Sequence, residues 1–395
     1  MTSFQVPGFQ FAGVACGIKE SGNKDLAVIF SEQPAVAAAL FTTNQIKSPA
    51  VLCGMERMKK SRLQAVVVNS GNANACTGPG GFKDAEAMCA EVGLRLDVQK
   101  DRVLPSSTGI IGMRLPMDKV RAGIAEATAQ LSPEALGDAA EAIMTTDRVP
   151  KIAHAQCRIG GRRVTIAGIA KGAGMIAPNM ATMLAYVFSD AAISAPVLKP
   201  MLRRAADQSF NAITVDGDCS TNDTVLCLAN GLARNPSIRR GTADAAVFER
   251  TLTKLMKGLA LGLLEDAEGA TKLVEIRVEG ARTVRDARRV AFAVANSSLV
   301  KTAFFGEDPN IGRIMVVIGG AGVRVAPDAV EVAFDRVKVV RRGVAVGTRE
   351  QDAAAVMKQR SFRVRIGLGI GRAAASVWTC DLSHEYVRIN SEYRT

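Results

Sequence analysis

The segment from Gly168 to Tyr186 combines residue types that could perform chemistry. Its first half, Gly-Ile-Ala-Lys-Gly-Ala-Gly, is rich in glycine and holds one lysine, Lys171, and its second half enters an apolar stretch through Thr182. Glycine is favoured where the backbone must come close to a ligand, and an ordinary core strand has little use for Gly-Ala-Gly beside a single lysine. The segment therefore indicates a ligand site next to the Thr182 hydroxyl.

The Thr182 hydroxyl becomes a useful nucleophile only if a base removes its proton. Histidine, a common base in such sites, occurs only twice in the chain. The N-terminal amine of a threonine can serve as the base instead, because its pKa is about 7.7–8.0. An internal Thr182 would gain such an amine if its hydroxyl attacked the carbonyl of Ala181, shifting the acyl group from nitrogen to oxygen before hydrolysis. On the residues alone, the alternative is a glycine-rich loop that leads into an ordinary strand.

Several other catalytic and binding motifs are absent from the sequence. There is no G-x-S-x-G, no H-E-x-x-H and no G-x-x-x-x-G-K-[ST], which argues against a serine hydrolase elbow, a zinc peptidase and a P-loop. The run Gly367–Gly371 is followed by strand-like sequence, so we expect a bend where backbones approach closely and not a dinucleotide site. Eight cysteines without C-x-x-C spacing, together with two histidines, make a metal site unexpected.

The formal charge of +12 invites comparison with nucleic-acid-binding proteins. The basic residues are spread along the chain, and the densest stretches, 282–289 and 338–342, lack the interleaved aromatic residues of a stacking platform. We therefore expect a solvated surface that favours anionic small molecules, and a basic nucleotide- or RNA-binding protein remains the non-catalytic alternative. With no secretory leader and no long apolar run, we expect a cytoplasmic protein that does not enter a membrane.

Hydrophobic periodicity predicts strands and helices in blocks and not in strict alternation. This pattern indicates a mixed α/β protein with mixed or antiparallel sheets covered by helices. We expect strands at Leu26–Phe30, Val36–Thr42, Gln64–Asn69, Ile152–Ile159, Val164–Ile169, Met183–Phe188, Ile314–Ile318, Val330–Phe334, Val337–Val340, Phe362–Gly367 and Ala374–Cys380. We expect helices at Lys83–Leu96, Met117–Leu131, Ser132–Met144, Ala195–Ser209, Ala243–Leu264, Thr283–Ala293 and Gln351–Lys358.

The segment around Thr182 closely resembles the cleavage and nucleophile motif of the ornithine acetyltransferase family, also called glutamate N-acetyltransferase or the bifunctional arginine biosynthesis protein. The resemblance covers nearly the whole chain in the same order, so it is specific even though each piece alone is weak. The other matching pieces are Gly13–Lys19, Phe41–Asn44, Asn69–Ala75, Ser107–Gly109, Met144–Asp147, Asp216–Asp218, Ser220–Asp223, Glu268–Lys272, Leu299–Thr302, Asp308–Asn310 and Tyr386–Thr395.

The resemblance implies an autoproteolytic acetyltransferase of arginine biosynthesis. The chain would cut itself between Ala181 and Thr182 into fragments 1–181 and 182–395, which stay intertwined as one catalytic unit in a layered sandwich similar to that of self-processing aminopeptidases. Thr182 would take acetyl from N-acetylornithine and pass it to glutamate in a ping-pong reaction. The resemblance further implies two copies of each fragment and no cofactor, and it leaves open whether acetyl-CoA also donates acetyl. An aminopeptidase or amide hydrolase with the same nucleophile is the catalytic alternative.

The resemblance also assigns roles to residues outside the nucleophile segment. Thr108 and Gly109 match the oxyanion hole, where pre-aimed donors stabilise the charge of the tetrahedral intermediate. Lys171 suits a substrate carboxylate and Glu268 a cationic amine, by charge complementarity. The positions that match substrate-binding residues are Thr145, Lys171, Thr182, Glu268, Asn390 and Thr395.

Each of these assignments has a structural alternative. Ser106–Gly109 could be an ordinary turn, Glu268 a surface carboxylate at a helix end, and Thr395 a frayed terminus. The sequence also departs from the family pattern, with Ile311 where a tryptophan usually follows Asp-Pro-Asn and with Cys219 where a threonine is more common. We expect the first change to alter packing more than chemistry.

Overall fold

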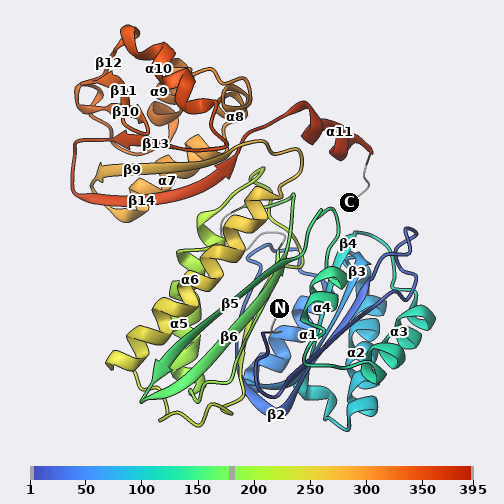
Figure 1. Ribbon diagram of the computed structural model, residues 1–395. Helices are drawn as coiled ribbons and strands as arrows, with labels where there is room; N and C mark the ends of the chain where they lie inside the picture. Colours follow the sequence, from blue (N-terminus) through green and yellow to red (C-terminus); the bar gives the residue numbers. More distant parts are fainter. Residues whose placement is uncertain (1–3, 178–182, 393–395) are drawn as a thin grey trace. The chain divides into compact units, whose positions relative to one another are not determined.

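The computed structural model describes residues 4–177 and 183–392, which fall into two compact units (Figure 1). Of the described residues, those up to 211 and 218–263 form unit 1, and 212–217 and 264–392 form unit 2. The predicted cleavage bond between residues 181 and 182 lies outside the described residues, and the described residues before and after it, up to 177 and from 183, belong to unit 1. The two units do not coincide with the two predicted fragments.

An eight-stranded mixed sheet forms the centre of unit 1, with the strand order β4-β3-β2-β8-β7-β6-β5 and with β1 added beside β2. The long strand β2 changes partners along its length. Its first part pairs with β3, its register shifts between Phe30 and Ala35, and its last part pairs with β8. The strands are β1 (Phe9–Val14), β2 (Leu26–Phe41), β3 (Arg62–Asn72), β4 (Val103–Ile110), β5 (Lys151–Ile159), β6 (Arg162–Lys171), β7 (Leu184–Ser189) and β8 (Thr224–Ala229).

The shift in β2 allows the two halves of this sheet to pack face to face. One buried cluster combines Ile29 and Val66 of the β2–β3 half with Ile169, Tyr186 and Leu226 of the β6–β8 half. Helices cover the outer faces. A second buried cluster joins α2 (Gly78–Leu96) and α3 (Met117–Ala129) to β1–β3. On the other half, the α6 (Ala243–Glu265) side chains Leu255 and Leu259 lie against the backbone of Gly168 in β6. The other helices of unit 1 are α1 (Pro49–Arg57), α4 (Leu136–Ala142) and α5 (Ala195–Asp207).

Unit 2 has its own six-stranded sheet, in the order β12-β11-β10-β13-β9-β14, and its own apolar core. Its strands are β9 (Leu273–Ala281), β10 (Glu331–Phe334), β11 (Val337–Arg341), β12 (Val344–Ala345), β13 (Ser361–Gly367) and β14 (Ala373–Cys380). Its helices are α7 (Val284–Ala295), α8 (Ser298–Phe305), α9 (Ile311–Gly320), α10 (Glu350–Met357) and α11 (His384–Glu392). The prediction of mixed α/β layers, with mixed sheets covered by helices, is confirmed.

Two local predictions are wrong. The expected strand Ile314–Ile318 is the middle of helix α9, where Ile314 and Ile318 are buried one turn apart and Val316 between them is 75% exposed. The expected helix Ser132–Met144 is much shorter, because Ser132 pairs with Phe11 in a β-bridge and only Leu136–Ala142 is helical. A short apolar run fits a helix and a strand equally well by periodicity, and pairing with β1 overrides the proline-containing helix start.

The glycine run after β13 is a close-packed bend, as expected. Gly369 has a φ of +65°, and a Cβ at Gly371 would lie 2.2 Å from the carbonyl oxygen of Ala281. Side chains are excluded by the neighbouring backbone, so the glycines serve chain packing there.

Candidate functional site

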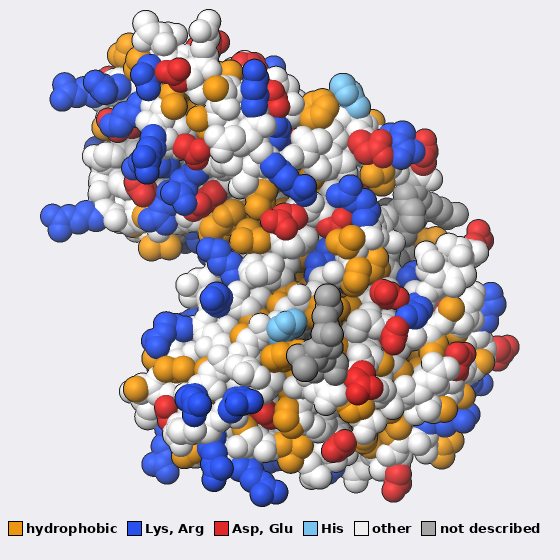
Figure 2. Space-filling view, in the orientation of Figure 1, with side chains coloured by type: hydrophobic (Ala, Val, Ile, Leu, Met, Phe, Trp, Pro, Cys, Tyr) orange, Lys and Arg blue, Asp and Glu red, His pale blue; other side chains and the backbone are white. Residues whose placement is uncertain are grey.

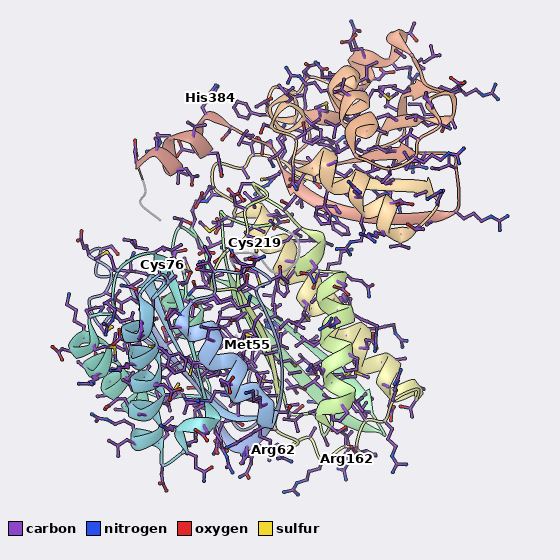
Figure 3. The ribbon with its side chains drawn as sticks, turned by 180° about the vertical axis from the view of Figure 1, so that it is seen from behind. Met55, Arg62, Cys76, Arg162, Cys219 and His384 are labelled. Carbon is purple, nitrogen blue, oxygen red and sulfur yellow. The ribbon has the colours of Figure 1, made fainter. Side chains whose placement is uncertain are left out.

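Three of the polar residues predicted from the sequence, Thr108, Thr145 and Lys171, gather at one end of the folded sheet in unit 1. Thr108 lies near the end of β4, and Lys171 ends β6. Arg62 and Arg162, which begin β3 and β6, lie at the opposite end of the unit from Cys76 and Cys219 (Figure 3). Folding the sheet at β2 therefore brings together strand ends that belong to different halves.

A buried lysine, itself a predicted site residue, is bonded to two other predicted residues. Lys171 is only 2% exposed, and its Nζ donates hydrogen bonds to Thr108 Oγ1 at 3.0 Å and to Thr145 Oγ1 at 2.8 Å. Because Thr108 Oγ1 accepts from Lys171, its own hydrogen can point elsewhere, as an oxyanion donor requires. Lys171 thus acts on two hydroxyls, in addition to any contact with a substrate carboxylate.

The backbone beside Thr108 accepts only glycine. Gly109 has a φ of +128°, and a Cβ there would lie 2.3 Å from the carbonyl carbon of Gly71 on the neighbouring strand. Gly71 pairs with Gly109 between the parallel strands β3 and β4. Pro105–Gly109 is therefore part of a strand, and the turn considered as an alternative is wrong. The strand holds the Thr108–Gly109 peptide in a fixed position.

Two sequence motifs that carried no assigned role support this strand end. Asn222 Nδ2 donates to the carbonyls of Ser107 and Ala73, each at 2.7 Å, and so ties the segment before β8 to the end of β4. Asn69 accepts from Ser107 Oγ at 2.7 Å and donates to Asn72 O at 2.8 Å. These amides belong to the pieces Asn69–Ala75 and Ser220–Asp223, and they fix the Thr108 backbone through buried hydrogen bonds.

Asp147 organises the loop that carries Thr145. It accepts hydrogen bonds from Lys151 Nζ at 2.5 Å, from the Thr145 amide at 3.1 Å and from the Gly172 amide at 2.8 Å. Burial alone would raise its pKa, but the charges of Lys171 and Lys151 and these hydrogen bonds hold the pKa below its usual value. A fixed negative charge therefore lies beside the Lys171 ammonium.

Asp223 is hydrogen-bonded to the residue that follows the predicted nucleophile. Its Oδ1 accepts from the amide of Met183, the residue after Thr182, at 3.0 Å. Among the described residues, its Oδ2 has no hydrogen-bond partner although the side chain is fully buried. Burial raises the pKa of this carboxyl well above its ordinary value. A buried carboxyl with a raised pKa is thus bonded to the backbone immediately after Thr182, and only the position of Asp223 after Ser220-Thr-Asn could have suggested it from the sequence.

In unit 2, the structure brings together two other predicted residues. Asn390 Nδ2 of helix α11 donates to Glu268 Oε2 at 2.8 Å. Ser383 Oγ donates to Gly269 O at 2.6 Å, and Tyr386 Oη to Asp216 Oδ2 at 3.1 Å, so the C-terminal helix is fastened beside Glu268. Val387 on this helix is 62% exposed, so its side chain adds little packing to these hydrogen bonds. Ala181, Thr182 and Thr395 lie outside the described residues.

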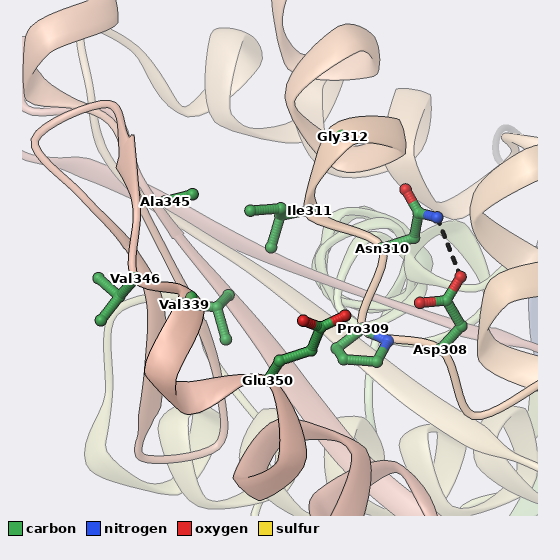
Figure 4. Close-up of a pocket in the computed structure, with 10 residues that line it drawn as sticks. Asp308, Pro309, Asn310, Ile311, Gly312, Val339, Ala345, Val346 and Glu350 are labelled. Carbon is green, nitrogen blue, oxygen red and sulfur yellow. Dashed lines mark hydrogen bonds between the residues drawn. The ribbon is translucent and has the colours of Figure 1, made fainter.

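The two positions that depart from the family pattern have different surroundings. Ile311 lines a pocket of about 340 Å³ in unit 2, together with Asp308, Val339, Val346 and Glu350 (Figure 4). Cys219 lies in unit 1, where its carbonyl accepts from Asn44 Nδ2 at 2.8 Å. The isoleucine therefore changes how a pocket is filled, in keeping with an effect on packing.

Other kinds of site find little support in the described part of the chain. Residues 4–177 and 183–392 contain no group of three His, Cys, Asp or Glu side chains that could hold a metal ion. No helix within those ranges has both the length and the apolar character to cross a membrane. His154 and His384 lie against the rings of Phe4 and Phe305. On the face shown in Figure 2, lysine and arginine side chains are scattered among acidic ones and form no continuous stripe.

The folded sheet, with a lysine–hydroxyl cluster at its strand ends, belongs to an enzyme of the acyl-transfer class. A model of the ArgJ family matches residues 10–395, and the chain belongs to this family. It is 50% identical over 391 residues to the arginine biosynthesis bifunctional protein ArgJ of Geobacter sulfurreducens, with 99% of this chain and 100% of the relative covered. It is 48% identical over 390 residues to the protein of that name from Symbiobacterium thermophilum, with 98% and 97% covered.

One solved structure extends this likeness to three dimensions. The crystal structure of the arginine biosynthesis bifunctional protein ArgJ from Bacillus halodurans is 38% identical, with a TM-score of 0.51. The match covers 53% of this chain and 98% of that chain. The family predicted from the sequence is confirmed.

Proposed function

We propose that this enzyme of arginine biosynthesis moves an acetyl group from N-acetylornithine to glutamate through an acetyl ester on Thr182. The observation that carries the proposal is the bonding of Lys171 to Thr108 and Thr145 at the end of the folded sheet. This cluster supplies a fixed hydroxyl donor and a cation where an acyl-transfer reaction develops negative charge. The family membership supplies the substrates.

In the first half-reaction, the Thr182 hydroxyl attacks the acetyl carbonyl of N-acetylornithine. Its proton passes to the Thr182 amine and then to the departing nitrogen, the amide C–N bond breaks, and ornithine leaves with an acetyl ester on the enzyme. In the second, the glutamate amine attacks the ester carbonyl and gives up a proton to the Thr182 amine. The ester C–O bond breaks, a new amide forms, and the Thr182 oxygen takes that proton back. The ester divides a difficult amide exchange into two easier acyl transfers.

Thr108 and Gly109 are the donors that we assign to the tetrahedral oxyanion. The Thr108 hydroxyl is held from behind by Lys171, and the Gly109 amide is held by its strand. Fixed donors need no reorganisation at the moment of reaction, and each contributes about 3–4 kcal/mol. Thr145, Glu268, Asn390 and Thr395 stay predictions as substrate contacts.

Self-cleavage before Thr182 is compatible with a stable product. Strand β7 begins two residues after Thr182 and is hydrogen-bonded to β6 on one side and to β8 on the other. Strand β8 also pairs with β2, so each predicted fragment supplies strands to one sheet. A cut in the connection before β7 leaves these ladders intact, and we expect the fragments to remain associated.

The length of the solved relative supports such a cut. The match covers 98% of the Bacillus halodurans chain but only 53% of this chain. The Bacillus halodurans chain is therefore about half as long as this one. Residues 182–395 make up slightly more than half of this chain and residues 1–181 slightly less. A chain of that size is expected if family members separate at this position.

An acetyl-transfer assay tests the proposal. Purified enzyme with N-acetylornithine and glutamate should give ornithine and N-acetylglutamate in equal amounts, and Thr182→Ala should give neither. Release of free acetate without any need for glutamate would instead identify an amide hydrolase, and no acetyl release from N-acetylornithine would overturn the proposal. Replacing N-acetylornithine by acetyl-CoA in the same assay decides whether the second donor is used.

We also propose a cytoplasmic enzyme with two copies of each fragment. This assembly rests on the family resemblance. Native mass spectrometry tests it, because a two-plus-two assembly has twice the mass of one cleaved chain.

A further inference from the structure

Lys19 lies beside the predicted oxyanion hole and has no role in the reaction described so far. It ends the sequence piece Gly13–Lys19, and its side chain crosses the backbone of Gly71, since a Cβ on Gly71 would lie 3.1 Å from Lys19 Cγ. Gly71 in turn pairs with Gly109. The lysine stem therefore lies over the strand that neighbours the Thr108–Gly109 peptide.

The loop that carries Lys19 is held by a buried carboxylate. Asp25 is fully buried, and it accepts hydrogen bonds from the amides of Cys16 at 2.7 Å, Ile18 at 2.6 Å and Lys19 at 2.9 Å. A buried carboxylate is costly unless it is bonded in this way. Three charge-assisted hydrogen bonds give the loop one conformation, and the position of Lys19 follows from it.

The ammonium of Lys19 keeps donors for a ligand. Among the described residues, its single hydrogen bond is to the carbonyl of Lys24 at 2.7 Å, and no carboxylate lies within ion-pair distance. An ammonium has three N–H donors, so two remain. The charged groups that act on it are Asp25, Lys171 and Asp147, and burial, the largest influence, lowers its pKa to about 8. Lys19 and Lys171 therefore face the same polar region, and Lys19 forms no ion pair there with a described carboxylate.

We propose that Lys19 is a substrate-binding residue that holds the α-carboxylate shared by the amino-acid substrates, next to the oxyanion strand. The proposal rests on the proposed function for the identity of these substrates. Lys171 donates hydrogen bonds to Thr108 and Thr145, whereas Lys19 donates one hydrogen bond, to the carbonyl of Lys24. A carboxylate supplies the acceptors that the two remaining N–H groups lack.

Binding measurements test the proposal without turnover. We would titrate ornithine and ornithinamide, which has a neutral amide in place of the carboxylate, into wild-type enzyme and Lys19→Met by calorimetry. Loss of a charge-assisted hydrogen bond predicts about tenfold weaker ornithine binding in Lys19→Met, with ornithinamide affinity unchanged. Equal affinity of both enzymes for ornithine, or an equal loss for both ligands, would overturn the assignment.

Lys119→Met is the matched control. Lys119 is exposed and donates to Gly17 O at 2.7 Å, so it touches the same loop without lying over Gly71. This variant should bind ornithine as the wild type does, and a tenfold loss in it would mean that loop stability is being measured.

A third variant separates charge from shape. Lys19→Arg keeps its charge at all working pH values, whereas wild-type Lys19 is charged below about pH 8 and neutral above it. Ornithine affinity should therefore fall more steeply from pH 7 to 9 in the wild type than in Lys19→Arg, and identical pH profiles would contradict the proposal. The comparison of wild type with Lys19→Arg also tests the proposed role of Lys19 if Lys19→Met does not fold. Failure of acetyl transfer with carboxylate binding intact would reject the proposed function alone.

Discussion

Two buried lysines, one in each unit, show how similar burial can serve different ends. Lys171 is 2% exposed and Lys301 is 3% exposed, and each donates to a threonine hydroxyl at 3.0 Å. Lys301 also donates to the carbonyl of Cys380, so it ties helix α8 to the end of β14. Lys171 bonds a second hydroxyl instead, that of Thr145.

The difference lies in what the partners can still do. The Thr379 hydroxyl that accepts from Lys301 donates its own hydrogen to the carbonyl of Ala295 at 3.2 Å, so this lysine serves as a cross-link within the fold. A hydroxyl that accepts from Lys171 still has a hydrogen to donate. A buried cation surrounded by hydroxyls is therefore a better indication of a reactive site than burial itself.

Replacement of Lys171 gives the largest expected effect. Lys171→Met removes the donor that fixes the Thr108 hydroxyl, and we expect kcat for acetyl transfer to fall by about 10²–10³, the loss typical of one oxyanion donor. Steady-state kinetics measure it, with thermal unfolding as a check that the fold persists. A kcat within threefold of the wild type would remove Lys171 from the mechanism.

Lys301→Met is the counterpart and should act on stability alone. The change leaves the buried hydroxyl of Thr379 and the carbonyl of Cys380 without their donor, so we expect a loss of about 1–3 kcal/mol in the free energy of unfolding. Chemical denaturation measures this loss, and kcat of the folded enzyme should stay close to that of the wild type. A large fall in kcat with unchanged stability would erase the contrast between the two lysines.

Asp223→Asn sharpens the comparison through pH. Burial raises the pKa of Asp223 in the folded state, whereas the unfolded carboxyl ionises near pH 3.9. As pH rises above that value, the unfolded state loses a proton that the folded state keeps, which favours unfolding. Asparagine can still accept from the Met183 amide but does not titrate, so the free energy of unfolding of Asp223→Asn relative to the wild type should rise as the pH increases above about 4. If the free energies of unfolding of the wild type and of Asp223→Asn changed with pH in parallel, Asp223 would be ionised in the folded state.

Ile311→Trp has the smallest expected effect. The larger side chain would occupy part of the pocket that Ile311 lines, and we expect a change in unfolding free energy within about 1 kcal/mol, with kcat unaltered. Differential scanning calorimetry and the transfer assay measure the two quantities. A tenfold change in kcat would show that this pocket contributes to activity.

Much of the site could be predicted, because its residues lie in pieces that resemble a family. Thr108, Thr145 and Lys171 are far apart in the sequence, and their contact depends on the partner change of β2, which periodicity does not reveal. The roles of Asn222 and Asp223 could not be predicted from the sequence either. Amides and carboxylates next to a strand look alike whether they bond to backbone, to a neighbour or to solvent.

The fold shows a similar limit. The apolar runs of β2, β6 and β7 predicted strands, because buried strands carry β-branched and small apolar residues. Ile314–Ile318 has the same composition and is helical, since Asn310 caps a helix there with its side chain. Local composition could not decide between them, and the cap was the missing signal.

The most direct test of the account is the mass of each fragment during half of the reaction. Enzyme incubated with N-acetylornithine and no glutamate is analysed by intact-mass spectrometry. We predict two fragments, the second beginning at Thr182 and heavier by one acetyl group, which glutamate then removes. An active enzyme that consists of one unbroken chain, or an acetyl group carried on the first fragment, would contradict the account.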